Sequence, residues 1–412
     1  MTPSVLLLGA DYYGTLAAAR CFGARGIRVV MADERAGARA MSSRHVAARL
    51  VHPPISDPAR LVDWLVAYGE QHPGTLLYPP NDHLAWLCAA ERERLARVFV
   101  MLSPDEQAVI SLLDKQRLHE VCRDPEVGID VPPTGTEPPR FPVLLKPRTQ
   151  VFLKSGIKGF IVQDAATLSA GLTRFRQLVR FHPVLTGRYP GIAEPMVQQY
   201  LPAAETSIFS VSGFVSPDGS IVARAAMKVL QRPRKIGIGL CFEGREVEPA
   251  LVAKLERLSR KVGYAGAFEA EFIADGDRRL LIDFNPRFYS QMGFEIARGL
   301  ALPMLVWHAA RGDQAALADE LRRAHAWKAT GREGYCHKTM FDLVLTVQRL
   351  SGQMSGEEVR HWRRWFADRQ EVVTDAVRDV TDPQPSKVDT RAWLREFATH
   401  PRSFVRTFIL NR

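Results

Sequence analysis

The stretch Glu271-Phe-Ile-Ala-Asp-Gly-Asp-Arg-Arg-Leu-Leu-Ile-Asp-Phe-Asn-Pro-Arg287 contains two apolar runs separated by an Asp-Gly turn signal. It predicts a β-hairpin that turns at that dipeptide. Asp283, Asn285 and Arg287 are two residues apart, so we expect all three side chains on one face of the second strand. The hairpin folds that face against Glu271 on the first strand.

This hairpin would gather two carboxylates, one amide oxygen and one guanidinium. Glu271, Asp283 and Asn285 are hard oxygen ligands of the kind that binds Mg²⁺ (or Mn²⁺) together with nucleotide phosphates. Arg287 is left free to meet a developing anion. The competing interpretation is an ordinary hairpin with polar ends, and the Asn-Pro-Arg sequence argues against it.

The segment resembles the metal-binding hairpin of the ATP-grasp superfamily, in which an acidic residue is followed on the next strand by Glu/Asp-x-Asn-x-Arg. The family more often has Glu where this chain has Asp283. The resemblance covers roughly residues 1–310 and is closest to the biotin-carboxylase and D-aspartate-ligase branch. It implies an α/β fold with an N-terminal parallel-sheet domain, a two-lobed ATP-grasp unit and a helical C-terminal extension. The implied boundaries are 1–108 for the N-terminal domain, 109–202 for the first lobe, 203–310 for the second lobe with the metal hairpin, and 311–412 for the C-terminal extension.

The resemblance also implies a nucleotide site. Lys115 on a helix and Lys146 at a strand end would meet the phosphates of ATP, since ammonium groups are strong partners for phosphate. The loop over the phosphates is poor in glycine, which leaves open a flexible surface loop instead. The remaining nucleotide-binding candidates are Lys154 and Gly156 in that loop, Gln198, Gln199 and Leu201 at the adenine edge, and Glu205 at the ribose.

A second cationic segment follows a predicted strand at Lys228-Val-Leu-Gln-Arg-Pro-Arg-Lys235. Lys228 is expected to point into the cleft, and Arg234 to clamp a substrate carboxylate or phosphate together with its basic neighbours. With Arg287, these are the catalytic candidates. A solvated basic loop is the alternative for Arg234.

The N-terminal residues predict a β-turn-α-β unit and therefore a parallel sheet. A buried strand from Val5 runs into a turn containing Gly9 and Gly14, and a second strand ends at Asp33. Asp33 would suit a ribose hydroxyl in a dinucleotide-binding protein, but the glycines do not have the Gly-x-Gly-x-x-Gly spacing.

The composition favours a soluble globular protein over a membrane or nucleic-acid-binding protein. A hydrophobic content of 46% with 24% charged residues is typical of a soluble globular protein. No apolar run is long enough for a membrane span, and the N-terminus does not read as a signal peptide. Five scattered cysteines favour a reducing cytoplasm. The net charge of +10 comes without a nucleic-acid-binding signature, so no nucleic-acid partner is expected.

The resemblance implies an ATP-dependent ligase that joins a small carboxylate to an amine by way of an acyl phosphate. Two alternatives stay open: a biotin-carboxylase-like enzyme that phosphorylates bicarbonate, and a nucleotide-binding protein without turnover. A homodimer is compatible with all three. The aromatic and basic tail from Trp393 could contact a membrane surface or an acidic partner. Pro401 interrupts any long helix there, and docking back onto the core is the favoured alternative.

Overall fold

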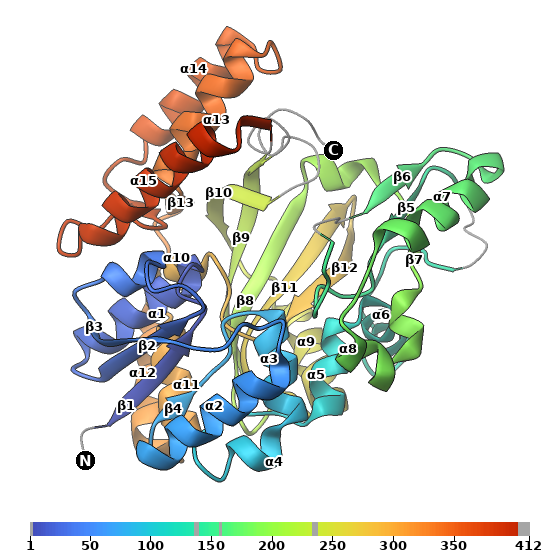
Figure 1. The fold of residues 1–412 in the computed structure, drawn as a ribbon. Coiled ribbons are helices and arrows are strands. Elements are labelled where there is room, and N and C mark those ends of the chain that lie inside the picture. Colours follow the sequence, from blue (N-terminus) through green and yellow to red (C-terminus); the bar gives the residue numbers. More distant parts are fainter. Residues whose placement is uncertain (1–2, 136–139, 156–158, 233–237, 403–412) are drawn as a thin grey trace.

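The computed structural model describes residues 3–135, 140–155, 159–232 and 238–402. Within these residues the strands form three sheets, of four, seven and three strands. Figure 1 shows the four-stranded sheet and the three-stranded lobe on opposite sides of the large sheet.

The four-stranded sheet is parallel and has the order β3-β2-β1-β4. The central strand β1 is apolar on both faces, as expected for a strand covered by helices on each side. The parallel sheet that the N-terminal residues predict is thus confirmed. Its elements are β1 (Ser4–Leu8), α1 (Tyr13–Ala24), β2 (Arg28–Asp33), η1 (Arg39–Ser42), β3 (Val46–Val51), α2 (Pro58–Gln71), β4 (Leu76–Leu77), α3 (Asp82–Ala90) and α4 (Arg92–Leu95).

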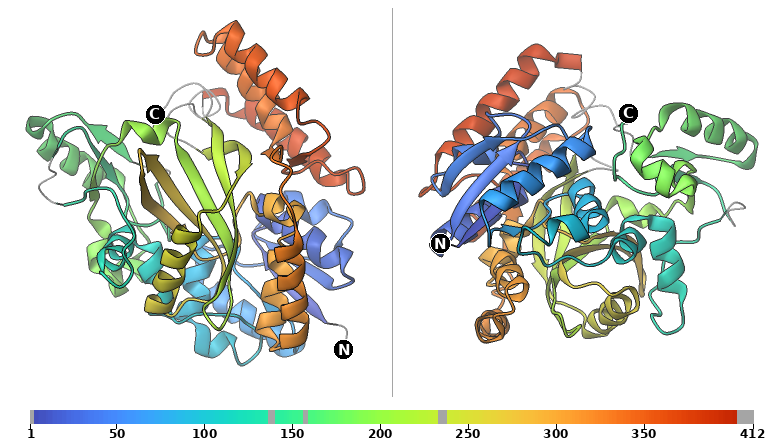
Figure 2. Two further views of the ribbon diagram at one scale, coloured as in Figure 1. Left: turned by 180° about the vertical axis from the view of Figure 1, so that it is seen from behind. Right: turned by 60° about the horizontal axis from the view of Figure 1, so that its bottom comes forward.

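The three-stranded sheet is antiparallel, with the order β6-β5-β7. Together with α7 and α8 it forms a lobe beside the large sheet (Figure 2). Helices α5 and α6 lead into it. The elements of this part are α5 (Glu106–Leu113), α6 (Lys115–Arg123), β5 (Val143–Lys146), β6 (Phe160–Val162), α7 (Ala165–Leu178), α8 (Pro183–Arg188), η2 (Pro190–Ala193), β7 (Met196–Gln199) and η3 (Pro202–Glu205).

The seven-stranded sheet has the order β12-β11-β8-β9-β10-β13-β14. The predicted hairpin is present as β11 and β12, which pair from Glu269–Asn285 to Asp275–Arg278 around a turn at Gly276. Helix α9 packs on one face of the sheet through leucines that share a core cluster with Phe268 and Phe272. The elements are β8 (Ile208–Val215), β9 (Ile221–Arg232), β10 (Ile238–Arg245), α9 (Pro249–Val262), β11 (Gly266–Asp275), β12 (Arg278–Asn285), β13 (Gly334–Cys336) and β14 (Val373–Asp375).

The region after residue 310 is mainly helical, and it also adds two strands to the sheet. Strand β13 pairs antiparallel with β10, and β14 pairs parallel with β13. Trp393 packs against the cluster that contains Met340 and Phe341, while residues 403–412 lie outside the described part. The helices that follow the hairpin are α10 (Met292–Ala297), α11 (Leu302–Ala310), α12 (Gln314–Ala326), α13 (Lys338–Leu350), α14 (Gly356–Ala367) and α15 (Gln384–Thr399).

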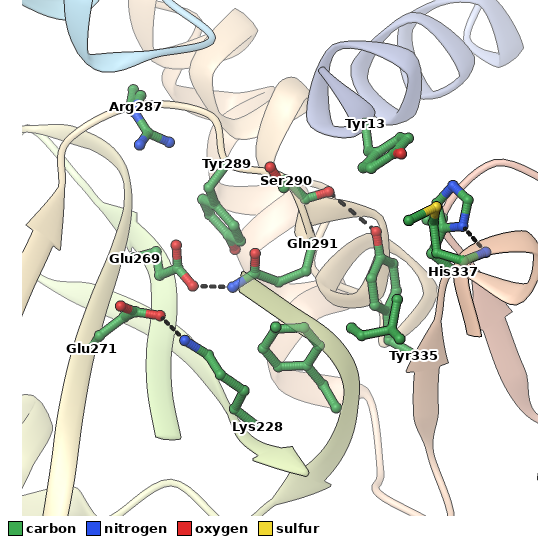
Figure 3. Close-up of a pocket in the computed structure, with 15 residues that line it drawn as sticks. Tyr13, Lys228, Glu269, Glu271, Arg287, Tyr289, Ser290, Gln291, Tyr335 and His337 are labelled. Atoms are coloured by element: carbon green, nitrogen blue, oxygen red, sulfur yellow. Dashed lines mark hydrogen bonds and ion pairs between the residues drawn. The ribbon is translucent and has the colours of Figure 1, made fainter. Parts of the chain in front are cut away.

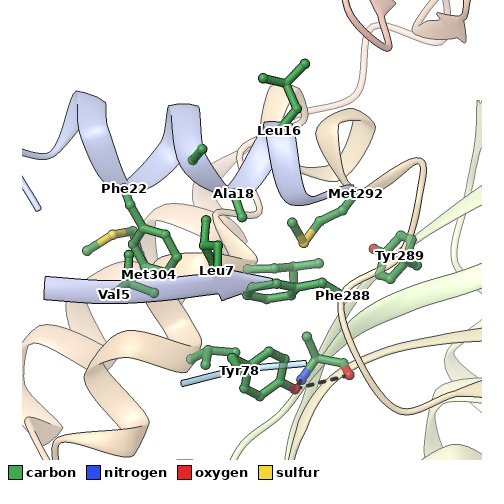
Figure 4. Packing of buried hydrophobic residues seen from close by; sticks show 14 of the residues in the cluster. Val5, Leu7, Leu16, Ala18, Phe22, Tyr78, Phe288, Tyr289, Met292 and Met304 are labelled. Carbon is green, nitrogen blue, oxygen red and sulfur yellow. Dashed lines mark hydrogen bonds between the residues drawn. The ribbon is translucent and has the colours of Figure 1, made fainter. Parts of the chain in front are cut away.

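The beginning and the later part of the chain are packed together. Phe22 of α1 lies in one apolar cluster with Phe288, Met292 and Met304 (Figure 4). The Arg20 guanidinium also pairs with the buried carboxylate of Asp382, at 3.0 Å from Nε to Oδ2. The N-terminal helix is therefore fixed both to the chain after the hairpin and to the C-terminal region.

No helix in the described ranges combines the length and apolarity that crossing a membrane requires. All five cysteines are free thiols. Cys241 and Cys336 face each other across β10 and β13 with their Sγ atoms 3.4 Å apart.

Candidate active site

The hairpin brings four polar side chains together by simple strand alternation. Phe268, Ala270 and Phe272 of β11 point into the core, so Glu269 and Glu271 point the other way. Across the ladder, Glu271 is opposite Asp283 and Glu269 is opposite Asn285. The side chains expected from the sequence thus share one face, with Glu269 in addition.

Two lysines neutralise the metal-ligand candidates. Lys115, at the start of α6, donates from Nζ to Asp283 Oδ1 at 2.8 Å, and Lys228 of β9 donates to Glu271 Oε1 at 2.7 Å. Both lysines are buried. Burial alone would lower the pKa of each, but the carboxylate partners outweigh burial, and each pKa is raised above its usual value.

Lys146 and Gln198 lie on neighbouring strands of the small lobe. Gln198 of β7 is opposite Leu144 of β5, and Lys146 is two residues beyond Leu144, so both side chains share one face. Burial and the Lys115 ammonium lower the pKa of Lys146 to about 7. The buried Gln198 Oε1 has no hydrogen-bond partner among the described residues.

Arg287 is in the site, but it is not free as the sequence suggested. Pro286 ends the strand, and the Arg287 guanidinium pairs through Nε with Asp82 and donates through Nη2 to Asn285 Oδ1 at 2.8 Å. Burial alone would raise the pKa of Asp82, but Arg287 outweighs this and holds it below its usual range. The arginine is therefore held in a fixed position by a carboxylate from the N-terminal part of the chain.

Three residues of the site were missed from the sequence. Asp82 follows a parallel strand at its carboxyl end, where ligand-binding residues gather, and this was an available signal. Glu269 lies on the same strand face as Glu271, so alternation could have identified it. Gln291, which donates to Glu269 Oε1, follows the hairpin in a segment that carries no recognisable pattern. Burial and the nearby Glu271 carboxylate raise the pKa of Glu269 well above its usual value.

Two of the other nucleotide-binding candidates, Gln199 and Glu205, are hydrogen-bonded to residues outside this cluster. The Gln199 backbone N–H is already bonded to Pro133 O, so it is not available to an adenine. Leu201 is buried, and Glu205 accepts a hydrogen bond from the Tyr200 hydroxyl at 2.7 Å. The Lys154 side chain is exposed. Gly156 and Arg234 lie outside the described residues.

The donor set fits a magnesium ion that is shared with phosphates. Nowhere in the described ranges do three His, Cys, Asp or Glu side chains form a metal-binding group. The hairpin instead offers two carboxylates, Glu271 and Asp283, and the amide oxygen of Asn285. Mg²⁺ usually takes one or two protein carboxylates and completes its shell with phosphate and water oxygens.

A cavity of about 220 Å³ adjoins this cluster. Lys228, Glu269, Glu271 and Arg287 line one end of it. Figure 3 shows the other end, formed by Tyr13, Tyr335 and His337, which come from α1 and from the C-terminal region. The cavity therefore lies where the sheet and both ends of the chain meet.

Asp33 does not take the role that the dinucleotide interpretation would give it. Its two carboxylate oxygens accept hydrogen bonds from the backbone N–H groups of Ala10, at 2.7 Å, and Arg35, at 3.1 Å. Asp33 therefore holds the turn after β1 to the end of β2.

Comparisons with known proteins identify the fold. No protein-family profile matches the chain, and no curated protein matches it in sequence. Among solved structures, biotin carboxylase from Campylobacter jejuni, in a β,γ-ATP complex, matches 75% of this chain and 71% of its own, with 15% identity and a TM-score of 0.59.

Two further structures match over similar lengths. L-amino acid ligase from Bacillus licheniformis covers 75% of this chain and 74% of its own, at 12% identity and a TM-score of 0.55. The second is the biotin carboxylase domain dimer of Hydrogenobacter thermophilus 2-oxoglutarate carboxylase, in complex with MgADP, ADP and bicarbonate. It covers 76% of this chain and 70% of its own, at 16% identity and a TM-score of 0.58. The fold predicted from the hairpin is confirmed by these matches.

Proposed function

We propose that this chain, whose fold is the ATP-grasp fold, is an ATP-dependent ligase that activates a carboxylate as an acyl phosphate and joins it to an amine. The observation that carries the proposal is the position of the cavity. Glu271, Lys228 and Arg287 belong both to the hairpin cluster and to the cavity wall. A small acid in the cavity would thus lie beside the groups that handle phosphate.

Both the nucleotide and the metal ion have candidate binding residues in this chain. Lys115 and Lys146 would neutralise the ATP phosphates, and Gln198 Oε1, which has no hydrogen-bond partner in the described part of the chain, is a candidate partner for the base. Glu271, Asp283 and Asn285 would hold Mg²⁺. When bound, the ion would neutralise phosphate charge and fix the geometry of the transfer.

The chemistry needs no covalent enzyme intermediate. A carboxylate oxygen of the acid attacks the γ-phosphorus, and ADP leaves with the electron pair of the broken P–O bond. The amine nitrogen then attacks the acyl carbon, loses a proton, and expels phosphate to leave an amide. Arg287, held by Asp82 and Asn285, would contact the oxygen that becomes negative in these steps.

The test is ADP and phosphate release from MgATP across a panel of carboxylic acids, each with and without a pool of amines and amino acids. Release that requires both an acid and an amine supports the ligase. Release with bicarbonate alone would replace it by the carboxylase-like alternative. MgATP binding without release under any condition would favour a binding protein.

Assembly and location belong to the same proposal. A homodimer is suggested by the Hydrogenobacter domain, which is described as a dimer. Light scattering coupled to size-exclusion chromatography tests this, and a monomeric mass at working concentration would contradict it. The five free thiols agree with a cytoplasmic location.

A further inference from the structure

The cavity beside the hairpin has two chemically different ends. The charged end contains Lys228, Glu269, Glu271 and Arg287. The other end is formed by Tyr13, Phe242, Tyr335, His337, Met340 and Ala376. Apart from Tyr13 and Phe242, these residues lie in the region after residue 310, which the ATP-grasp resemblance does not cover.

The aromatic rings at this end are packed in two pairs. The Tyr13 and His337 ring centroids are 4.8 Å apart, and those of Phe242 and Tyr335 are 6.0 Å apart. The Tyr335 hydroxyl donates to Ser290 O at 3.2 Å, which fixes that ring against the loop carrying Arg287. A flat or branched apolar group can pack against such rings, and aromatic pairs add stabilisation beyond the burial of area.

None of the described residues that line this end is a lysine or an arginine, and the Arg39 guanidinium, which lies over the Tyr13 ring, is already paired with Asp389. His337 Nδ1 accepts the Met340 backbone N–H at 3.0 Å, and its Nε2 lies 3.0 Å from Asp389 Oδ2, so both ring nitrogens already face groups of the protein. Among the described lining residues, the only lysine or arginine side chains are Lys228 and Arg287, both at the charged end. A phosphate or second carboxylate at the aromatic end would be buried without a lysine or arginine partner among the residues described there, which is costly.

The size of the cavity points in the same direction. At about 220 Å³ it is below the range of about 300–1,000 Å³ that is common for drug-sized ligands. It suits a single small metabolite, not a peptide or a nucleotide-linked acid.

We propose that this cavity binds the acid substrate, and that the acid is a small monocarboxylate with an aromatic or branched apolar body. The carboxylate lies at the Arg287 end and the body packs between Tyr13 and Tyr335. This rests on the proposed ligase function for the fate of the carboxylate, but the binding itself does not require turnover.

The experiment measures binding of four probes by calorimetry in the presence of Mg²⁺ and a non-hydrolysable ATP analogue. The probes are 3-phenylpropanoate, L-phenylalanine, glutarate and L-glutamate, which vary the apolar body and the α-amino group independently. We expect at least one aromatic probe to bind about tenfold or more tightly than its dicarboxylate counterpart, because the second carboxylate finds no lysine or arginine in the lining that the structure describes at the aromatic end. Equal or tighter binding of a dicarboxylate, or no binding of either aromatic probe, overturns the proposal.

Variants locate the binding in this cavity. Ala376→Leu places extra methyl groups in it and is expected to weaken the aromatic probe about tenfold or more. Ala367→Leu, at an exposed position of α14 in the same region, is the matched control and should leave binding unchanged. Tyr335→Phe keeps the ring and should retain the affinity for the aromatic probe. Tyr335→Leu removes the ring and should lower that affinity about three- to tenfold. Unchanged affinity in Ala376→Leu would place the acid elsewhere.

The two proposals can fail separately. If an aromatic acid binds, Ala376→Leu weakens it, and no acid and amine pair gives ADP, the cavity assignment stands and the ligase function falls. If ADP release needs an acid whose binding is indifferent to Ala376→Leu, the ligase stands and the cavity assignment falls.

Discussion

At the residue scale, the candidate site balances buried lysines against half-buried carboxylates, with Arg287 also half-buried. Three ion pairs cross between different elements: Lys115 with Asp283, Lys228 with Glu271, and Arg287 with Asp82. Removing one partner of such a pair leaves the other buried and unpaired, which destabilises more than the pair itself stabilises. Variants here change stability as well as chemistry, and the two effects must be separated.

Glu271→Gln tests the metal-ligand prediction. We expect at least about a 100-fold loss of acid-dependent ADP release, because a preorganised charge at the phosphates is lost. The melting temperature should also fall, since Lys228 loses its partner. The double variant Glu271→Gln/Lys228→Met should recover the melting temperature but not activity, and Asp277→Asn in the exposed hairpin turn should change neither. Activity above a tenth of wild type in Glu271→Gln would remove that residue from the site.

Lys146 links nucleotide binding to pH. Its pKa of about 7 without nucleotide means that it is mostly neutral at about pH 8, whereas a bound polyphosphate favours the charged ammonium. ATP binding should therefore take up a proton above pH 7, and ATP affinity should fall as pH rises through that range. Calorimetry in buffers of different ionisation enthalpy measures the uptake. Lys146→Arg, which stays charged, should show much less uptake, and identical uptake in both proteins would contradict the assignment.

Much of the site could be predicted from spacing, and the missing part has a physical reason. Glu271, Asp283 and Asn285 could be predicted from the sequence because the alternation of side chains along a strand depends only on neighbouring residues. The pairing of Arg287 with Asp82 joins residues far apart in sequence, and no local pattern encodes that contact. Alternation also placed Arg287 on the strand face, but Pro286 ends the ladder, since proline has no N–H to donate.

At the element scale, the first turn of α1 packs against the loop after the hairpin. A Cβ on Gly14 would lie 2.2 Å from the Tyr289 carbonyl oxygen, a backbone atom that cannot move aside easily. Tyr13 and Tyr289 both line the cavity, so this contact sets the distance between two of its walls.

Gly14→Ala is therefore expected to lower the free energy of unfolding by about 1–3 kcal/mol, the usual cost of overpacking. It should also weaken binding of the aromatic acid probe. Gly187→Ala is the control, because it lies in helix α8 with no atom within 4 Å of the added Cβ, and it should leave stability equal or slightly higher. Urea titration measures the free energy of unfolding of both variants, and calorimetry measures binding of the acid probe. A Gly14→Ala protein as stable as wild type would show that the loop can yield.

The two strands of the C-terminal region show where sequence patterns are weakest. β13 and β14 have three residues each, too few for an alternation of apolar and polar positions to stand out. They join the sheet because β10 offers a partner for β13, and this contact between residues far apart in sequence cannot be read from a local pattern. The helices around them carry longer amphipathic patterns, and the sequence predicted that this region is mainly helical.

At the scale of the whole molecule, Asp382 joins the C-terminal region to the N-terminal sheet. Its carboxylate accepts from Arg20, from the Ser43 hydroxyl at 2.7 Å and from the Arg44 backbone N–H at 2.9 Å. Burial would raise the pKa of Asp382, but these donors outweigh it and hold the pKa below its usual value. The stabilisation is fully present above the unfolded pKa of about 4 and is lost as pH falls through the lower folded value.

Asp382→Asn should lower the free energy of unfolding at pH 7 by about 1–3 kcal/mol, because buried donors lose a charged acceptor. The difference from wild type should shrink as pH falls below about 4. Asp319→Asn, in an exposed pair on α12, is the control and should change stability little. Urea unfolding at several pH values measures the effect, and a difference that grows toward low pH would refute it.

The place of β13 in the sheet has a consequence for how the protein is made. During synthesis, β10 emerges well before its partner, because α9, the hairpin and three further helices lie between Arg245 and Gly334. Until then β10 presents an unpaired edge carrying Leu240 and Phe242, and such edges invite aggregation. The wall that contains Tyr335 and His337 is absent for the same interval. A nascent or truncated chain that lacks β13 would thus be prone to aggregate and would lack a complete acid pocket, so the proposed activity would be acquired only after β13 has been synthesised.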